Sequence, residues 1–178
     1  MTGADDVTLV RNALRGDREA FGLLVERYQG QIFNVALRIT GDRAEAEDVA
    51  QNVFLKVYEN LASFDTGRRL FSWIYRIAVN EALNAERRRK SHEVLEDHDA
   101  PAASGVDNVD HAGIIQASLL ALKPEHRAVL VLRHFQDLSY EEIGEALGLP
   151  VRKVKSRLFT ARALLRGLLE QRGLRHDD

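Results

Sequence analysis

The residues best suited to binding chemistry are the cations near the C-terminal end of the sequence. Residues 150–172 contain seven Lys and Arg and a single Glu, a net charge of +6. Cationic side chains neutralise phosphates, and Arg pairs in a bidentate manner with guanine, so this segment predicts binding to nucleic acid. The overall charge of −2 conceals this feature, because basic and acidic residues are unevenly distributed along the chain.

A short capped helix, followed by a turn and a second helix, is predicted to position these cations. Ser139 and Glu142 form a capping-box pattern, Gly148 suits the end of a helix, and Pro150 suits the start of the next one. The second helix has one apolar stripe, made of Val154, Leu158, Ala161, Leu165 and Leu168. Its opposite face carries Arg152, Lys153, Lys155, Ser156, Arg157 and Thr160. The pattern predicts a DNA-binding helix-turn-helix, with a purely structural helical hairpin as the alternative.

A second basic cluster, Arg87–Lys90, ends the first half of the chain. The segment before it mixes aromatic residues with Arg76 and Asn80, a composition that suits unpaired bases. The alternative for the basic run is a helix end that faces solvent. The alternative for Trp73, one of the aromatic residues in this segment, is a position in the hydrophobic core.

No set of residues with catalytic spacing is found. The chain has no Cys, which excludes disulfides, thiolate metal sites and Cys nucleophiles. It also has no phosphate-binding loop and no nucleophile motif, and His126 and His134 lack partners at zinc-type spacing. We therefore expect a protein that is not an enzyme and that needs neither a metal nor another cofactor.

The composition predicts an all-α chain. Of 178 residues, 45% are hydrophobic and only three are Pro, and no apolar run approaches the ~20 residues of a membrane span. The N-terminus lacks the basic and apolar regions of a secretory signal, so a cytoplasmic protein is expected. Within residues 17–62 the apolar spacing predicts two long helices that meet at a turn over 39–42.

The charge pattern predicts two small helical domains joined by a flexible acidic linker. Residues 1–90 carry a net charge of +1, residues 91–113 carry −6, and residues 114–178 carry +3. The middle segment has no Lys or Arg and no apolar periodicity, as is typical of a linker.

Three segments together resemble the extracytoplasmic-function class of bacterial sigma factors. They are EAEDVAQNVFLKVYENLASFD, FSWIYRIAVNEALNAERRR and LKPEHRAVLVLRHFQDLSYEEIGEALGLPVRKVKSRLFTARALL. The resemblance implies that residues 1–90 are sigma region 2 and residues 114–178 are sigma region 4. It also implies that the protein binds core RNA polymerase, reads the −35 and −10 promoter elements, and promotes melting of the promoter.

The resemblance further implies which residues would contact polymerase. One helix would dock on the clamp coiled coil of the largest subunit through Asp48, Gln51, Phe54, Leu55 and Tyr58. Asn52 departs from the acidic residue that is common there. The flap of the second-largest subunit and an anti-sigma factor are further partners that the family implies.

Two sets of residues would contact promoter DNA. The −10 set comprises Ser63, Phe64 and Asp65, in a loop over 61–67 that would hold a flipped base, together with Arg76, Asn80, Asn84, Arg87 and Arg88. The −35 set comprises Arg152, Lys153, Lys155, Ser156, Arg157, Phe159 and Arg162. Arg152-Lys153 replaces a frequent Gly-Thr and Thr160 a frequent Arg, so the −35 sequence cannot be copied from relatives.

Three other functions compete with this interpretation. A stand-alone helix-turn-helix regulator would use residues 1–90 for dimerisation or sensing, and would find its site without core polymerase. A partner-switching helical protein that mimics a sigma factor would not need the basic face over 152–162. A DNA-modifying enzyme would need acid, base or metal groups that the sequence lacks.

Overall fold

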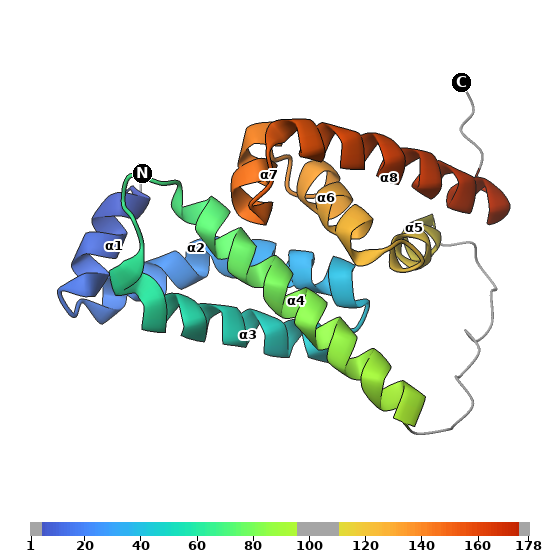
Figure 1. The fold of residues 1–178 in the computed structure, drawn as a ribbon. Coiled ribbons are helices and arrows are strands. Elements are labelled where there is room, and N and C mark those ends of the chain that lie inside the picture. Colours follow the sequence, from blue (N-terminus) through green and yellow to red (C-terminus); the bar gives the residue numbers. More distant parts are fainter. Residues whose placement is uncertain (1–4, 96–110, 175–178) are drawn as a thin grey trace.

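The computed structural model describes residues 5–95 and 111–174, and within these ranges the protein is all-α. The first half consists of α1 (Asp6–Leu14), α2 (Arg18–Thr40), α3 (Arg43–Asn60), the short 3₁₀ helix η1 (Leu61–Ser63) and α4 (Leu70–Leu95). The second half consists of α5 (His111–Leu120), α6 (Pro124–His134), α7 (Tyr140–Leu147) and α8 (Val151–Gln171) (Figure 1).

The turn between α2 and α3 is specified by two adjacent residues, Gly41 and Asp42. Gly41 follows the last residue of α2 with a φ of 75°, a left-handed conformation that glycine adopts without steric cost. Asp42 then caps α3 by accepting a hydrogen bond from the Glu45 amide at 2.7 Å. The two long helices and the turn over 39–42 that the sequence predicts are thereby confirmed.

The first half is a bundle in which α2, α3 and α4 pack on one another and α1 packs on α2. Each long helix contributes one apolar stripe. Leu24, Ile32 and Val35 come from α2, Val53 comes from α3 and Ile74 comes from α4, and all are at most 3% exposed. Away from its stripe α3 exposes large side chains such as Leu55 and Tyr58, whereas α2 and α4 also pack against helices of the second half.

The second half contains the predicted helix-turn-helix. Ser139 and Glu142 complete a reciprocal capping box at the start of α7, and Gly148 ends that helix with a φ of 65°. Val154 and Leu158 bury one side of α8 against the second-half core, of which Leu130 and Ile143 are fully buried members. The fold is therefore all-α with two small helical domains.

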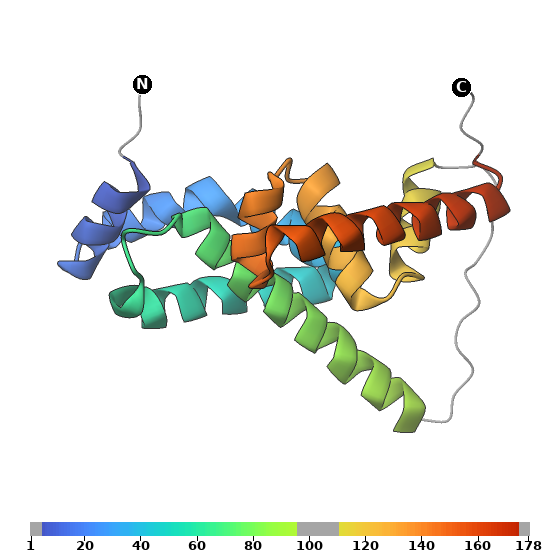
Figure 2. The same cartoon turned by 45° about the horizontal axis from the view of Figure 1, so that its top comes forward.

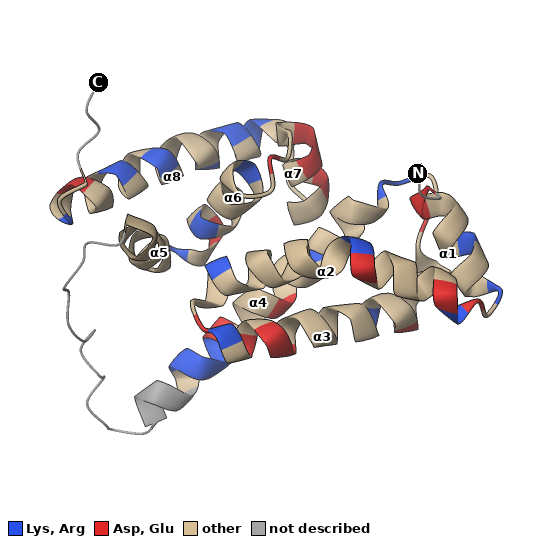
Figure 3. Ribbon diagram, turned by 180° about the vertical axis from the view of Figure 1, so that it is seen from behind, with Lys and Arg blue, Asp and Glu red and all other residues tan. Residues whose placement is uncertain are grey.

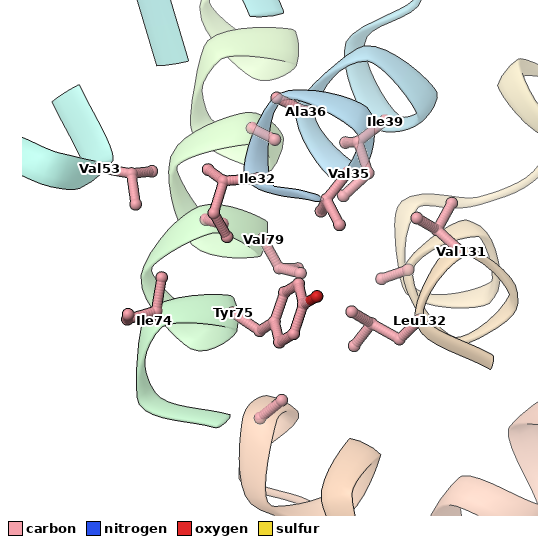
Figure 4. Close-up of a cluster of buried hydrophobic side chains, with 14 of the residues drawn as sticks. Ile32, Val35, Ala36, Ile39, Val53, Ile74, Tyr75, Val79, Val131 and Leu132 are labelled. Atoms are coloured by element: carbon pink, nitrogen blue, oxygen red, sulfur yellow. The ribbon is translucent and has the colours of Figure 1, made fainter. Parts of the chain in front are cut away.

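The two halves pack directly against each other. Helix α4 lies along α7, and the C-terminal part of α2 lies against α5 and α6 (Figures 1 and 2). Tyr75 and Val79 of α4 meet Val131 and Leu132 of α6 in a shared apolar cluster (Figure 4). Helix α4 continues to Leu95 and α5 begins at His111, so the helices extend into both ends of the predicted linker, whose residues 96–110 lie outside the described residues.

We predict opposite outcomes for two adjacent leucines of α2. Leu24 is 1% exposed and Leu23 is 44% exposed. Leu24→Ala should lower the free energy of unfolding by about 2–5 kcal/mol, because it leaves a cavity in the core. Leu23→Ala should change it by less than about 0.5 kcal/mol. Urea unfolding followed by circular dichroism measures both, and equal effects of the two substitutions would contradict the packing described for α2.

Candidate nucleic-acid and polymerase interfaces

Helix α8 presents a cationic face opposite its buried stripe. Arg152, Lys153, Lys155 and Ser156 are all exposed on its first two turns, while Arg157 is half-buried. Figure 3 shows Lys and Arg at intervals along α8. The ring of Phe159 is 78% exposed, so it lies outside the core and faces solvent beside the cations. Arg162 is exposed one turn further along the helix.

The ring of Tyr140 lies between two of the second-half cations. Lys155 Nζ is 5.7 Å from the centroid of this ring, and the guanidinium carbon of Arg133 is 5.3 Å from it. Both distances are within the range of cation–π attraction. Arg133 also donates to the backbone oxygen of Leu138 at 2.8 Å, which joins α6 to the loop before α7. These contacts orient the start of α8 relative to α7.

His134 and Arg162 form a coupled pair at the surface. Arg162 Nε donates to His134 Nε2 at 3.3 Å, which requires this imidazole nitrogen to be unprotonated. Burial, followed by the charges of Arg162 and Arg133, holds the pKa of His134 below its ordinary value. His134 thus positions an arginine of the predicted −35 set, a role that its sequence context did not suggest.

Helix α4 carries the predicted −10 residues on one side. Arg76, Asn80, Arg87 and Arg88 are exposed and Asn84 is half-buried. The opposite side is core. The hydroxyl of Tyr75 donates to Gln136 Oε1 at 2.9 Å, and burial raises the pKa of Tyr75 to about 12. Trp73 is half-buried against Phe64, with the ring centroids 5.0 Å apart, and packs at the edge of the core.

The loop before α4 has exposed and buried members. Ser63 and Asp65 are exposed, whereas Phe64 is 8% exposed because it lies beneath Trp73. Asp65 Oδ1 accepts a hydrogen bond from the Gly67 amide at 2.9 Å, and this bond shapes the turn. The loop therefore presents its polar side chains outward and anchors itself through Phe64.

Two large apolar residues of α3 face solvent. Leu55 is 55% exposed and Tyr58 is 59% exposed, while Asp48 and Gln51 are exposed on the same helix and Phe54 is half-buried. Tyr58 touches Phe21 of α2 edge-to-face, with ring centroids 5.1 Å apart. Exposed apolar side chains of this size are typical of protein–protein contact surfaces. Leu55 and Tyr58 are thus available to a partner.

The structure brings members of the two predicted DNA-binding sets together. Arg157 of the −35 set lines one cavity of about 390 Å³ with Arg76, Asn80 and Arg87 of the −10 set. The charged residues that join the halves were not predicted from sequence. Arg127 Nη1 lies 2.9 Å from Glu86 Oε2, and both side chains are at most 3% exposed. The position of Arg127 in an apolar run is a weak signal that periodicity alone cannot interpret.

Comparison with known proteins identifies the family. Residues 24–92 match the family model for sigma-70 region 2, and residues 112–165 match that for sigma-70 region 4. The chain is 34% identical over 174 residues to the ECF RNA polymerase sigma factor SigW of Bacillus subtilis, covering 88% of this chain and 92% of SigW. The chain belongs to the extracytoplasmic-function sigma factors. The RNA polymerase sigma-H factor of Pseudomonas aeruginosa is 35% identical over 179 residues, covering 91% of this chain and 92% of that protein.

Solved structures of sigma factors share the fold. The structure of CnrH in complex with the cytosolic domain of CnrY matches with a TM-score of 0.74 and 29% identity, over 93% of this chain and 97% of the other. The sigma factor RpoE in complex with the anti-sigma factor NepR from Bartonella quintana matches with a TM-score of 0.68 and 24% identity, over 84% of this chain and 96% of that one.

This sigma factor is therefore a transcription initiation factor and not an enzyme, as the sequence predicts. Its region 4 contains the helix-turn-helix domain. Among the described residues, no helix combines the length and the apolar character needed to cross a membrane.

We predict that Arg162→Ala raises the pKa of His134 part of the way to its ordinary value of 6.5, because one of the two repelling cations is removed while the burial remains. NMR titration of the imidazole resonances measures this pKa. Arg166→Ala, one turn further along α8, is the matched control and should leave it unchanged. Since the lowered pKa means that the unfolded chain binds this proton more readily, His134 stabilises the fold less as the pH falls below about 6.5. An unaltered titration in Arg162→Ala would contradict the coupling.

Proposed function

We propose that α8 reads the −35 element from the major groove. The observation that carries this proposal is the exposed cationic face at the start of α8, which lies opposite the buried Val154, Leu158 and Ala161 and follows the capped helix α7. A single helix fits the major groove, and its first turns reach the base edges. Arg152, Lys153, Lys155, Ser156 and Arg157 occupy those turns, and Phe159 and Arg162 extend the same surface.

The exposed side of α4 and the loop before it would contact the −10 element. In this proposal Ser63, Phe64 and Asp65 belong to the base-holding loop, with Phe64 supporting it from below. The polar side of α4 would follow the upstream edge of the element through Arg76, Asn80, Asn84, Arg87 and Arg88. Removing a base from the duplex costs a few kcal/mol, and stacking on the protein recovers about 1–3 kcal/mol per base. Base capture therefore favours melting without any catalytic step.

The exposed part of α3 would bind the clamp coiled coil of the largest polymerase subunit. Leu55 and Tyr58 supply apolar contacts at its centre, and Asp48 and Gln51 supply polar contacts, with Phe54 beneath. The flap of the second-largest polymerase subunit would bind the second domain, residues 114–178. The division into region 2 over 1–90, a linker over 91–113 and region 4 over 114–178 fits these roles, because the two promoter elements lie apart on the DNA.

An anti-sigma factor is a further partner that we propose. The RpoE structure, which shares this fold, contains such a factor. Core polymerase is a cytoplasmic enzyme in bacteria, so the proposed activity places this chain in the cytoplasm. A stand-alone regulator is disfavoured because both halves of the chain match sigma-70 family models, region 2 as well as region 4.

We predict that substitutions near the start of α8 change the preferred −35 sequence, whereas a substitution later in α8 changes only the overall affinity for DNA. Ser156→Ala and Arg157→Ala should change which −35 sequences support transcription, since a bidentate Arg–guanine pair is worth about 1–3 kcal/mol of discrimination. Arg166→Ala, further along the helix, should lower binding evenly and reduce its salt dependence. Transcription from a randomised −35 library with the same core polymerase measures the preferred bases. A uniform loss without any shift in preferred bases would remove Ser156 and Arg157 from the reading face.

We also predict that Tyr58→Ala weakens binding to core polymerase at least tenfold without unfolding the protein, because the side chain is 59% exposed. A partner-facing aromatic residue commonly contributes more than about 1.4 kcal/mol, which is a tenfold change in affinity. Affinity for core polymerase and thermal unfolding are measured on the same sample. Asn60→Ala, at the end of the same helix, is the control. Unchanged polymerase affinity in folded Tyr58→Ala would exclude this residue from the interface.

A further inference from the structure

One cation of the basic run Arg87–Lys90 is engaged within the first half of the protein. Arg89 Nε lies 3.6 Å from Oε2 of Glu45, an acidic residue in the first turn of α3. Arg89 Nη2 donates to the backbone oxygen of Thr40, the last residue of α2, at 3.4 Å. Figure 3 shows the basic end of α4 beside the acidic start of α3. A single side chain of α4 therefore contacts both sides of the turn between α2 and α3.

The periodicity of α4 explains why Arg89 reaches this turn. Ala78, Ala82 and Ala85 are at most 3% exposed and belong to the buried side of the helix. Steps of three and four residues return to the same side of an α-helix. Arg89 follows Ala85 by four residues, so it continues the buried side of α4 beyond the apolar core.

Arg87 and Arg88 leave α4 on a different side. They follow the exposed Asn80 by seven and eight residues, which places them on the side of α4 that carries Asn80. Both are exposed, and among the side chains that the structure describes no carboxylate forms an ion pair with either. These two cations are available to phosphates, whereas their neighbour Arg89 already has partners.

Arg89 meets two chemical needs at the turn between α2 and α3. The last carbonyls of an α-helix have no partner within the helix, and Thr40 is only 1% exposed. Arg89 supplies a donor to this oxygen and places a cation at the negative end of α2. Burial raises the pKa of Glu45, and the charge of Arg89 acts against that rise by favouring the carboxylate. The contacts of Arg89 thus stabilise the end of one helix and the start of the next.

We propose that Arg89 and Glu45 form a clasp that fixes the last turns of α4 on the turn between α2 and α3. In this role Arg89 is a positioning residue, which holds Arg87 and Arg88 toward DNA and binds no phosphate itself. The inference rests on the proposed contact of Arg87 and Arg88 with the −10 element. Because α3 also carries the proposed polymerase surface, the clasp fixes the DNA-contacting side of α4 relative to that surface.

Charge reversal separates positioning from phosphate binding. Arg89→Glu should lower the affinity of the full chain for a fluorescent 40-base-pair DNA duplex of mixed sequence by about threefold in either role. Glu45→Arg in the same chain rebuilds an ion pair, so it should recover most of the lost affinity. The control combines Arg89→Glu with Glu47→Arg, which gives the same net charge at an exposed residue of α3 whose partner is Arg43. This control should recover less.

Amide hydrogen exchange over residues 84–90 measures the clasp without DNA. We expect faster exchange in Arg89→Glu and in its combination with Glu47→Arg, and exchange close to that of the parent protein when Glu45→Arg is present instead. Circular dichroism verifies that each variant is folded. Unchanged exchange in Arg89→Glu, or equal recovery of DNA affinity in the two double variants, would overturn the proposal.

Arg87→Gln and Arg88→Gln test the function on which the inference rests. Each should reduce the slope of the logarithm of DNA affinity against the logarithm of salt concentration by about 0.9, the value for one lost phosphate contact. Unchanged slopes in both variants would contradict the proposed −10 contact. The hydrogen-exchange comparison would still decide whether the clasp exists, so the two failures are distinguishable.

Discussion

The guanidinium of Arg127 is the group on which the arrangement of the second half depends. The last carbonyls of an α-helix have no partner within the helix, and at the end of α5 the fully buried Arg127 supplies donors for them. Arg127 donates to the Leu119 and Leu120 oxygens of α5 and to the Leu122 oxygen beyond it. A planar group with five N–H donors suits this task, whereas Lys could not bond to so many oxygens in such fixed directions. The same guanidinium also donates to the backbone oxygen of Ile39 and pairs with Glu86, and these two contacts orient the first half relative to the second.

A second constraint explains why binding residues and core residues share the same helices. Helix α3 buries one narrow stripe, so much of its surface stays outside. On α3 the stripe is Val49, Val53 and Val57, with steps of four residues, and Leu55 and Tyr58 fall on the other side. Their exposure follows from this register. On α8 the cations likewise lie on the side away from the buried residues. The packing of the core therefore determines which side chains of a helix are available to a partner.

The helices and their ends could be predicted from sequence because local chemistry determines them. The capping box of Ser139 and Glu142 and the left-handed Gly148 act within a few residues, and the stripe of α8 has one regular period. The contact between the halves could not be predicted in this way. Glu86 directly precedes the basic run Arg87–Lys90, which is typical of a solvated helix end, yet Glu86 is 2% exposed because it pairs with Arg127, 41 positions later in the chain. Nothing in local periodicity indicates which distant cation a carboxylate will meet.

Glu142 shows how local and long-range order are joined in a single side chain. Its Oε2 accepts from the Ser139 amide at 2.7 Å and completes the cap of α7, while its Oε1 accepts from Arg69 of the first half at 2.9 Å. The acidic first turn of α7 also interacts favourably with the positive end of that helix. Where the halves meet, the carboxylates of Glu142 and Glu86 pair with Arg69 and Arg127 of the opposite half. The cap that forms the helix-turn-helix therefore also contributes to the attraction that holds the halves together.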